Sequence, residues 1–150
     1  MFLILLLYFW YPCYNLIGDN MKTIKVVAAI IKKDDKILIA QRLKGEFAGQ
    51  WEFPGGKIEE GEHPEEALIR EIMEEMELEI SINEYLMTAE YDYPNFHLSM
   101  DCYICSLKTD IIQLHDHSAI QWISIKDDIK NINWIPADVQ IIESLQTKFN

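Results

Sequence analysis

The sequence predicts a single layered domain of the α/β or α+β class, a mixed β-sheet sandwiched between α-helices. Strand-like runs rich in Val, Ile and Tyr alternate with polar turns over most of the chain. Two further segments begin with proline and carry apolar residues at helical spacing. Strands mixed with two helices are typical of a layered fold. The 150 residues suffice for one substantial core and are too few for two.

The first twenty residues differ from the rest. Residues 1–17 read MFLILLLYFWYPCYNLI, an uncharged apolar run that is interrupted at Pro12. The uninterrupted part is about half of the ~20 residues that a membrane helix needs, and neither a basic start nor a small-residue cleavage site marks a signal peptide. Three interpretations stay open: an upstream extension with Met21 as the natural start, a weak membrane anchor, or an element packed on the domain. In each case we expect the functional domain to span residues 21–150, with residues 1–20 as an apolar extension.

The charge of the chain bears on its partners. The 25 Asp and Glu residues outnumber the 13 Lys and Arg residues, for a net charge of −12, which repels polymeric nucleic acid. A nucleotide remains a suitable ligand, because a bound Mg²⁺ inverts the local field. We therefore expect a small-molecule partner, a monomer or homodimer, and membrane association only if residues 1–20 anchor the chain.

The three cysteines, Cys13, Cys102 and Cys105, do not form a disulfide framework. Cys102 and Cys105 lie in a strand-like run, where their odd spacing sends the side chains to opposite faces. We interpret them as packed thiols rather than a metal or redox pair, and a reducing cytoplasm as the location.

The N-terminal half of the domain predicts a β-hairpin and a loop. TIKVVAAIIKKDDKILIAQRL contains two strands separated by a turn over residues 32–36, with core candidates Ala28, Ile30, Ile37 and Ile39. Residues 44–50 are polar with two glycines and predict a loop. WEFP then leads into a turn at Gly55 and Gly56.

The next element is a helix over residues 64–77. Pro64 suits the first turn, and Glu62, Glu65 and Glu66 suit the positive N-terminal end. At 100° per residue, one face gathers apolar side chains and another gathers acids. We expect packing by Ile69, Ile72, Met73 and Met76, and an acidic face of Glu71, Glu74 and Glu75.

The remainder predicts four strands and a second helix. The strands cover residues 79–82, 85–93, 97–107 and 121–124, separated by polar turns. The helix begins near Pro136 and carries Val139, Ile142 and Leu145 at helical spacing.

The acids of the first helix have two interpretations. A solvated helix face is the ordinary one. However, Glu71, Glu74 and Glu75 are like charges at i, i+3 and i+4, which destabilise a helix by a few tenths of a kcal/mol per pair unless something neutralises them. Hard oxygen ligands of this kind suit Mg²⁺ or Mn²⁺ beside substrate phosphates.

Rival motifs are weaker. Gly56-Lys57 is followed by Ile58 rather than Ser or Thr, so there is no P-loop, and no G-x-G-x-x-G opens the helix. The histidines lack the fixed spacing of a zinc site; they are His63, His97, His115 and His117.

One long pattern carries a family resemblance. Gly56, five residues, Glu62, seven residues, then REIMEEM and, after Glu77, Leu78 resembles the Nudix box. KVVAAIIKKDDKILIAQR, WEFPGGK, HDHSAIQW and PADVQII resemble MutT-like Nudix hydrolases, above all the CTP pyrophosphohydrolase and 8-oxo-dGTP diphosphatase group. Glu77 stands where the family pattern has glycine. Because a glycine there serves the helix C-cap, we expect Glu77 to cost some stability or to shift the helix end, without touching metal ligands.

The resemblance implies a nucleotide pyrophosphohydrolase. In that family the box holds Mg²⁺, and water cleaves a nucleoside triphosphate to monophosphate and pyrophosphate. Carried over, the metal ligands are Glu71, Glu74, Glu75 and the Gly55 carbonyl, and Arg70 orients the acids. Arg42 matches a phosphate-binding arginine, a role that suits guanidinium chemistry. For the general base, Glu71, Glu62 and the loop acid Asp116 stay open.

The resemblance also places base recognition at Phe53, Tyr93, Phe96 and Asp138. An ionised Asp138 only accepts hydrogen bonds, which favours a base with an amino donor, such as cytosine, whereas a protonated Asp138 also donates. The expected role is nucleotide-pool sanitation, linked to DNA repair, or (d)CTP cleavage. Two alternatives stay open: hydrolysis of a diphosphate-linked substrate such as ADP-ribose, and a nucleotide sensor that no longer catalyses.

Overall fold

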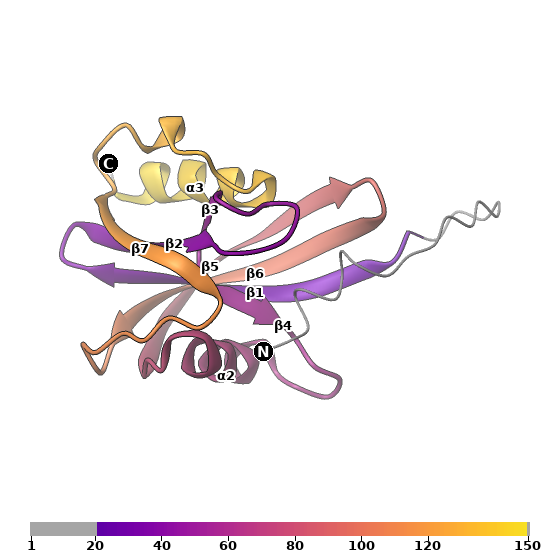
Figure 1. The fold of residues 1–150 in the computed structure, drawn as a ribbon, viewed down its shortest axis with the longest axis horizontal. Helices are drawn as coiled ribbons and strands as arrows, with labels where there is room; N and C mark the ends of the chain where they lie inside the picture. Colours follow the sequence, from indigo (N-terminus) through magenta and orange to yellow (C-terminus); the bar gives the residue numbers. More distant parts are fainter. Residues whose placement is uncertain (1–20, 150) are drawn as a thin grey trace.

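The computed structural model describes residues 21–149, and it confirms the layered α+β class. Within that range a seven-stranded mixed sheet lies between α2 and α3 (Figure 1). The strands are β1 (Thr23–Lys33), β2 (Lys36–Arg42), β3 (Trp51–Glu52), β4 (Gly55–Lys57), β5 (Ile80–Tyr93), β6 (Phe96–Leu107) and β7 (His117–Ser124). The helices are α2 (Pro64–Met76), the short 3₁₀ helices η1 (Ile129–Asn131) and η2 (Pro136–Asp138), and α3 (Val139–Phe149).

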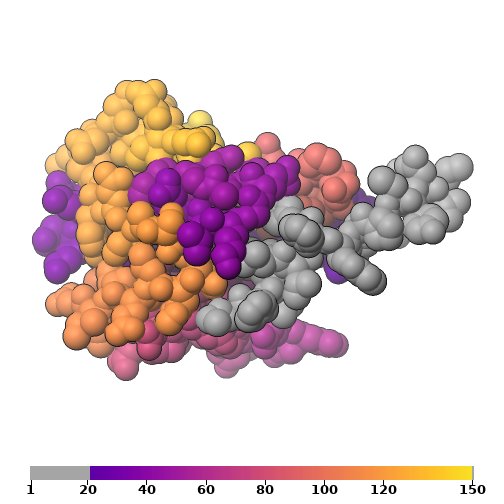
Figure 2. All heavy atoms as spheres, viewed as in Figure 1, coloured from indigo at the N-terminus to yellow at the C-terminus, as the bar shows by residue number. Residues whose placement is uncertain are grey.

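The sheet is organised around β1. Its strand order is β3-β2-β1-β6-β5, with β4 also paired to β1 and β7 also paired to β2. β1 runs parallel to β6 and antiparallel to β2 and β4. The expected β1–β2 hairpin is confirmed, and its turn places Asp34 at φ 55°. Figure 2 shows the face on which the segments around β2 and β3 (violet) lie against β7 (orange).

Two hydrophobic clusters cover the two faces of the sheet, because side chains alternate along each strand. The cluster beneath α3 contains all four expected core residues, Ala28, Ile30, Ile37 and Ile39. The cluster beneath α2 contains the intervening β1 residues together with Leu68, Ile72 and Met76 of the helix.

The cysteines behave as predicted. Cys102 and Cys105 are free, buried and assigned to opposite clusters. Burial raises the pKa of the Cys105 thiol to about 12 and that of Cys102 further, so neither is poised as a thiolate. Cys13 lies outside the described residues.

Three expected boundaries need correction. The two strands predicted over residues 79–82 and 85–93 form one strand, β5, because the irregularity near Asn83 is absorbed as register shifts against β6 rather than as a break. β7 begins at His117 instead of residue 121, where pairing with β2 outweighs the polar sequence. Gly55 and Gly56 are not in a turn but in strand β4, paired with β1.

The packing face of α2 also differs from the prediction. Ile72 and Met76 are buried as expected, but Ile69 is 48% exposed and Met73 is 39% exposed. The helix is rotated toward Ala67, Leu68, Glu71 and Glu75. The acidic face of the helix therefore points partly into the molecule instead of outward. The candidate site described below depends on this orientation.

Among residues 21–149, no helix is long and apolar enough to cross a membrane. The expectations for residues 1–20 lie outside the described residues.

Candidate active site

Arg70 of α2 hydrogen-bonds to several carboxylates of α2 and of the loop that precedes it. Its guanidinium donates to both oxygens of Glu62 at 2.7 and 2.9 Å, to Glu71 at 2.8 Å, to Glu74 at 3.3 Å and to the Lys57 carbonyl at 3.0 Å. One cation thus orients three acids from the helix and the loop before it.

Glu62 is bound to Arg70 through both of its carboxylate oxygens. Hydrogen bonds from Arg70 lower the pKa of Glu62 to about 2, against the opposing effect of burial and with help from the Glu59 N–H. A carboxylate of such low pKa takes up almost no protons near neutral pH.

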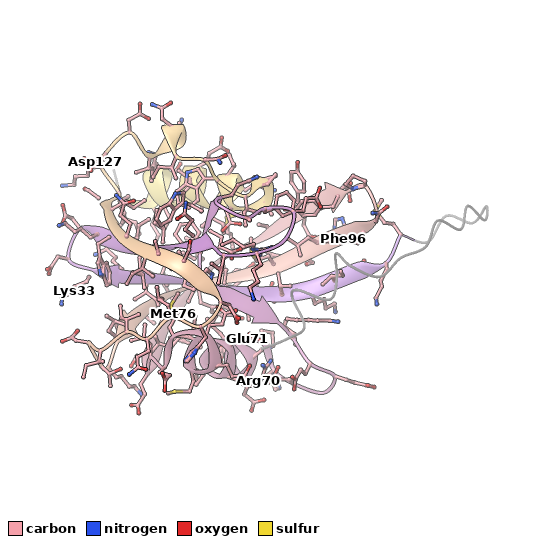
Figure 3. The ribbon with its side chains drawn as sticks, viewed as in Figure 1. Lys33, Arg70, Glu71, Met76, Phe96 and Asp127 are labelled. Carbon is pink, nitrogen blue, oxygen red and sulfur yellow. The ribbon has the colours of Figure 1, made fainter. Side chains whose placement is uncertain are left out.

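Glu71 lies against β4, the strand that contains Gly55 and Gly56 and is called the glycine strand below. A Cβ added at Gly56 would meet the Glu71 carboxyl carbon at 2.2 Å, and a Cβ at Gly55 would meet the Val27 carbonyl oxygen at 1.9 Å. Gly55 thus permits close β1–β4 pairing, and Gly56 leaves room for the carboxylate. Figure 3 shows Glu71 between α2 and the sheet, with Arg70 beside it. Burial raises the pKa of Glu71, and Arg70 partly offsets the effect.

Glu75 is the most deeply buried acid of α2. It is 4% exposed, and its Oε2 is buried without a hydrogen-bond partner. Burial, followed by the charges of Glu52, Glu71 and Asp116, raises its pKa well above the ordinary value. A buried carboxylate surrounded by other acids is costly unless a cation joins it.

Asp116 reaches the same region from another part of the chain. The backbone N–H groups of Gln113 and His115 donate to the carbonyls of Met76 and Glu75, at 3.0 and 3.1 Å. These bonds fasten the segment before β7 to the last turn of α2. They place half-buried Asp116 close enough for its charge to act on Glu75.

A pocket opens on the other side of the glycine strand. All four residues predicted for base recognition line it: Phe53, Tyr93, Phe96 and Asp138. The rest of the lining consists of apolar side chains of β1, β6 and η2 and of Arg42, Glu52, Gly55 and Gly56. Tyr93 and Phe96 stack at 4.9 Å between ring centroids, and Phe53 stacks on Trp134 at 5.4 Å. Figure 3 shows Phe96 at the β5–β6 end of the sheet.

Asp138 closes the pocket beneath Phe53. Its Oδ1 accepts the Phe53 N–H at 2.8 Å, and the side chain is buried. Burial, strengthened by the charge of Glu52, raises the pKa of Asp138 to about 8, although the Phe53 N–H and Arg42 oppose the shift. At neutral pH this carboxyl is mostly protonated and can both donate and accept.

Arg42, Glu52 and His117 form a part-buried network, of which Arg42 and Glu52 line the pocket. Arg42 donates to Glu52 from Nε at 3.2 Å and Nη2 at 2.7 Å, and His117 Nε2 donates to Glu52 Oε1 at 3.1 Å. Burial would raise the pKa of Glu52, but His117 and Arg42 hold it below the ordinary value. Sequence reasoning singled out Arg42 and missed the other two as site residues.

The residues present fit a divalent cation. Glu71 and Glu75 are hard oxygen donors with raised pKa values, and one Glu75 oxygen lacks a partner. Over residues 21–149, no three His, Cys, Asp or Glu side chains already converge as a metal cluster, since Arg70 engages Glu71 and Glu74. The histidines do not form a zinc site there either.

Comparison with known proteins decides the family. The model of the NUDIX domain matches residues 21–145. The chain belongs to the Nudix family.

Relatives of this Nudix hydrolase act on nucleotides, by their names. The chain is 36% identical over 125 residues, 83% of its length and 92% of the relative, to the CTP pyrophosphohydrolase of Escherichia coli strain K12. It is 39% identical over 87 residues, 57% of its length and 78% of the relative, to the 8-oxo-dGTP diphosphatase of Proteus vulgaris. The solution structure of the Escherichia coli ORF135 protein superposes with a TM-score of 0.73 at 35% identity, covering 85% of this chain and 91% of that one.

The family membership agrees with the resemblance seen in the sequence, and Nudix hydrolases generally use divalent metal ions. The Nudix box itself was recognisable from spacing. Glu52 and His117 were not, because their significance lies in strand pairing that brings together residues 65 positions apart. The single available signal was their presence in WEFPGGK and HDHSAIQW, two of the segments on which the resemblance rests.

Proposed function

We propose that this Nudix hydrolase cleaves nucleoside triphosphates to monophosphate and pyrophosphate with Mg²⁺, or Mn²⁺ in its place. The observation that carries the proposal is that buried Glu71 lies against Gly56, which lines the pocket together with Arg42, and that buried Glu75 lies within range of the charges of Glu52 and Arg42. A substrate whose base lies in the pocket then presents its phosphates to the acids. We further propose that the functional domain comprises residues 21–150, acts on small nucleotides rather than polymers, and works in the cytoplasm as a monomer or homodimer.

The acids and the two arginines of the site have separate roles in this proposal. Glu71, Glu74 and Glu75, with the Gly55 carbonyl, would hold the metal, which when bound neutralises phosphate charge and acidifies water. Arg70 orients Glu71 and Glu74 through the hydrogen bonds described above. Arg42 binds the phosphates, since a guanidinium matches the geometry of phosphate oxygens.

We propose Asp116 or Glu71 as the general base in preference to Glu62. Both Glu62 oxygens accept hydrogen bonds from Arg70, and its pKa is about 2. A group of such low pKa is a poor proton acceptor near neutral pH. Asp116 is half-buried on a loop beside Glu75, and Glu71 has a raised pKa.

Base selection is assigned to Phe53, Tyr93, Phe96 and Asp138. A protonated Asp138 offers one donor and one acceptor, which complements the ring nitrogen and amino group of cytosine. CTP, dCTP and their modified forms are therefore the proposed first substrates. 8-oxo-dGTP is the second, and such activity would serve nucleotide-pool sanitation.

Glu74→Gln tests the metal assignment. The substitution removes one anionic ligand from a side chain that is 37% exposed, so it should lower kcat by at least about 100-fold while the fold is retained. Turnover of CTP with Mg²⁺ and thermal unfolding are measured together.

Glu65→Gln is the matched control. Glu65 lies on the first turn of the same helix and is exposed, so the same charge is lost away from the site and turnover should stay within about twofold of the wild type. Equal rates for wild type and Glu74→Gln would rule out the proposed ligand set.

A further inference from the structure

The pair formed by half-buried Glu52 and buried His117 has no role in the reaction as proposed so far. His117 is 7% exposed, and its Nδ1 is buried without a hydrogen-bond partner. Its Nε2 contacts Glu52 Oε1 at 3.1 Å. Because an ionised carboxylate only accepts, Nε2 must carry the hydrogen.

Strand pairing brings these residues to Arg42. β2 pairs with both β3 and β7, and a register shift after Gln41 sets Arg42 opposite His117. Ser118 supports the irregularity, since its hydroxyl donates to the Gln41 carbonyl and side-chain oxygens at 3.4 and 3.2 Å. Without the shift, Arg42 and His117 would not be partners across the two strands.

Glu52 connects the two side chains. Its Oε1 accepts from both His117 Nε2 and Arg42 Nε, and its Oε2 accepts from Arg42 Nη2. The side chains of Arg42 and Glu52 are only 17% and 15% exposed, so water competes weakly for these bonds. The two-bond fork fixes the plane of the guanidinium, and His117 fixes the carboxylate on which the fork depends.

We propose that His117 is a positioning residue that holds the Glu52 carboxylate in place and thereby aims Arg42 at the substrate phosphates. The inference rests on the proposed phosphate-binding role of Arg42. His117 itself touches no substrate. It contributes by orienting Arg42, which binds the other side of the Glu52 carboxylate.

Two amide variants test the inference, because they differ in reach and not in polarity. The amide nitrogen of His117→Gln falls near the position of Nε2 and can still donate to Glu52, whereas that of His117→Asn falls near Nδ1 and is too short. Affinity for inorganic triphosphate with Mg²⁺ is measured by calorimetry, and kcat and KM are measured with CTP. We expect His117→Asn to weaken triphosphate binding about tenfold and to raise KM more than it lowers kcat, and His117→Gln to stay within about threefold of the wild type.

The second half of the experiment repeats His117→Asn in an Arg42→Ala background. If His117 acts through Arg42, the second substitution adds no further loss of affinity. His115→Leu is the control, since His115 is exposed and bonded to Glu77 instead. It should leave triphosphate affinity unchanged. If His117→Asn does not fold, Glu52→Gln takes its place, with the same loss and the same lack of additivity expected.

The outcomes separate the inference from the proposed function. Equal losses for His117→Asn and His117→Gln, or a full further loss in the Arg42→Ala background, would overturn the positioning role while CTP hydrolysis stands. Triphosphate binding that follows the expected pattern, without turnover of any nucleotide, would support the positioning role and overturn the proposed function.

Discussion

Glu71, Glu75 and Asp138 are buried carboxylates whose pKa values are all raised, and each has a different local reason. Glu71 lies against Gly56, Glu75 lacks a partner for one oxygen, and Asp138 lies beneath Phe53 with one backbone donor. Raised pKa values in one region are typical of functional sites rather than of stability alone. Burying these groups costs folding free energy. In the function that we propose, each of them binds a cation or a base, which explains why they are buried.

Asp138→Asn should change how stability depends on pH. The folded-state pKa of Asp138 is about 8, against an ordinary value of 3.8. Its favourable contribution is therefore fully present below about pH 4 and is lost as the pH rises toward 8, since the folded state must bury the charge or keep the proton. The asparagine side chain keeps the acceptor for Phe53 and does not titrate. Relative to the Asp138→Asn variant, the wild type should lose on the order of 5 kcal/mol of unfolding free energy between about pH 4 and pH 9.

Urea unfolding of both proteins over this pH range measures the difference. Asp101→Asn is a suitable control, because Asp101 is a half-buried carboxylate on the neighbouring β6 strand that accepts a bond from Thr88. Parallel curves for the wild type and Asp138→Asn would mean that Asp138 does not hold its proton.

Individual residues of the site were predictable to the extent that the chain presents them locally. The acids of the box and Arg70 lie on adjacent turns of one helix or in the loop that leads directly into it, so spacing predicts their proximity. Glu52 and His117 meet through strand pairing and a register shift. No local pattern encodes that meeting.

At the scale of elements, α2 is the helix on which the account depends. Its start follows the sequence, with Pro64 in the first turn and the His63 N–H donating to Glu66 at 3.2 Å. Its end is strained, since Glu77 adopts the left-handed conformation at φ 52°. The sequence predicted this position as a C-cap that lacks its glycine, and the structure confirms that geometry.

Glu77→Gly should stabilise the protein. Glycine adopts positive φ without the steric cost of a Cβ, so the gain should be about 1 kcal/mol in unfolding free energy, less a few tenths for the exposed hydrogen bond with His115. Urea denaturation measures it. Glu77→Ala loses the same hydrogen bond but keeps the Cβ, so it should not be stabilised; equal effects of glycine and alanine would exclude backbone strain as the cause.

The rotation of α2 shows where pattern reasoning fails. Counting apolar residues predicts that Ile69 and Met73 pack, yet both are substantially exposed, and Glu71 and Glu75 are buried instead. A hydrophobic pattern assumes that carboxylates avoid the interior. Glu71 is held inward by its bond to Arg70 and by the space that Gly56 leaves, neither of which a helical projection contains.

At the scale of the whole molecule, the site joins two faces of one sheet. α2 covers one face of the sheet (Figure 1). The base pocket opens on the other face and is lined in part by Gly55 and Gly56 of β4. The sequence predicted the layers, because strand and helix periodicities differ, and it predicted most strands within a few residues. It could not predict the strand order β3-β2-β1-β6-β5, since that order depends on contacts between distant segments.

The most direct test of the account is the identity of the products. Purified protein is incubated with CTP, dCTP or 8-oxo-dGTP and Mg²⁺ in water enriched in oxygen-18, and the products are identified by phosphorus NMR and mass spectrometry. We predict nucleoside monophosphate and pyrophosphate in equal amounts, with no turnover when a chelator removes the metal. Nucleoside diphosphate with orthophosphate, or turnover that persists with the chelator, would contradict the proposed metal-dependent pyrophosphohydrolase.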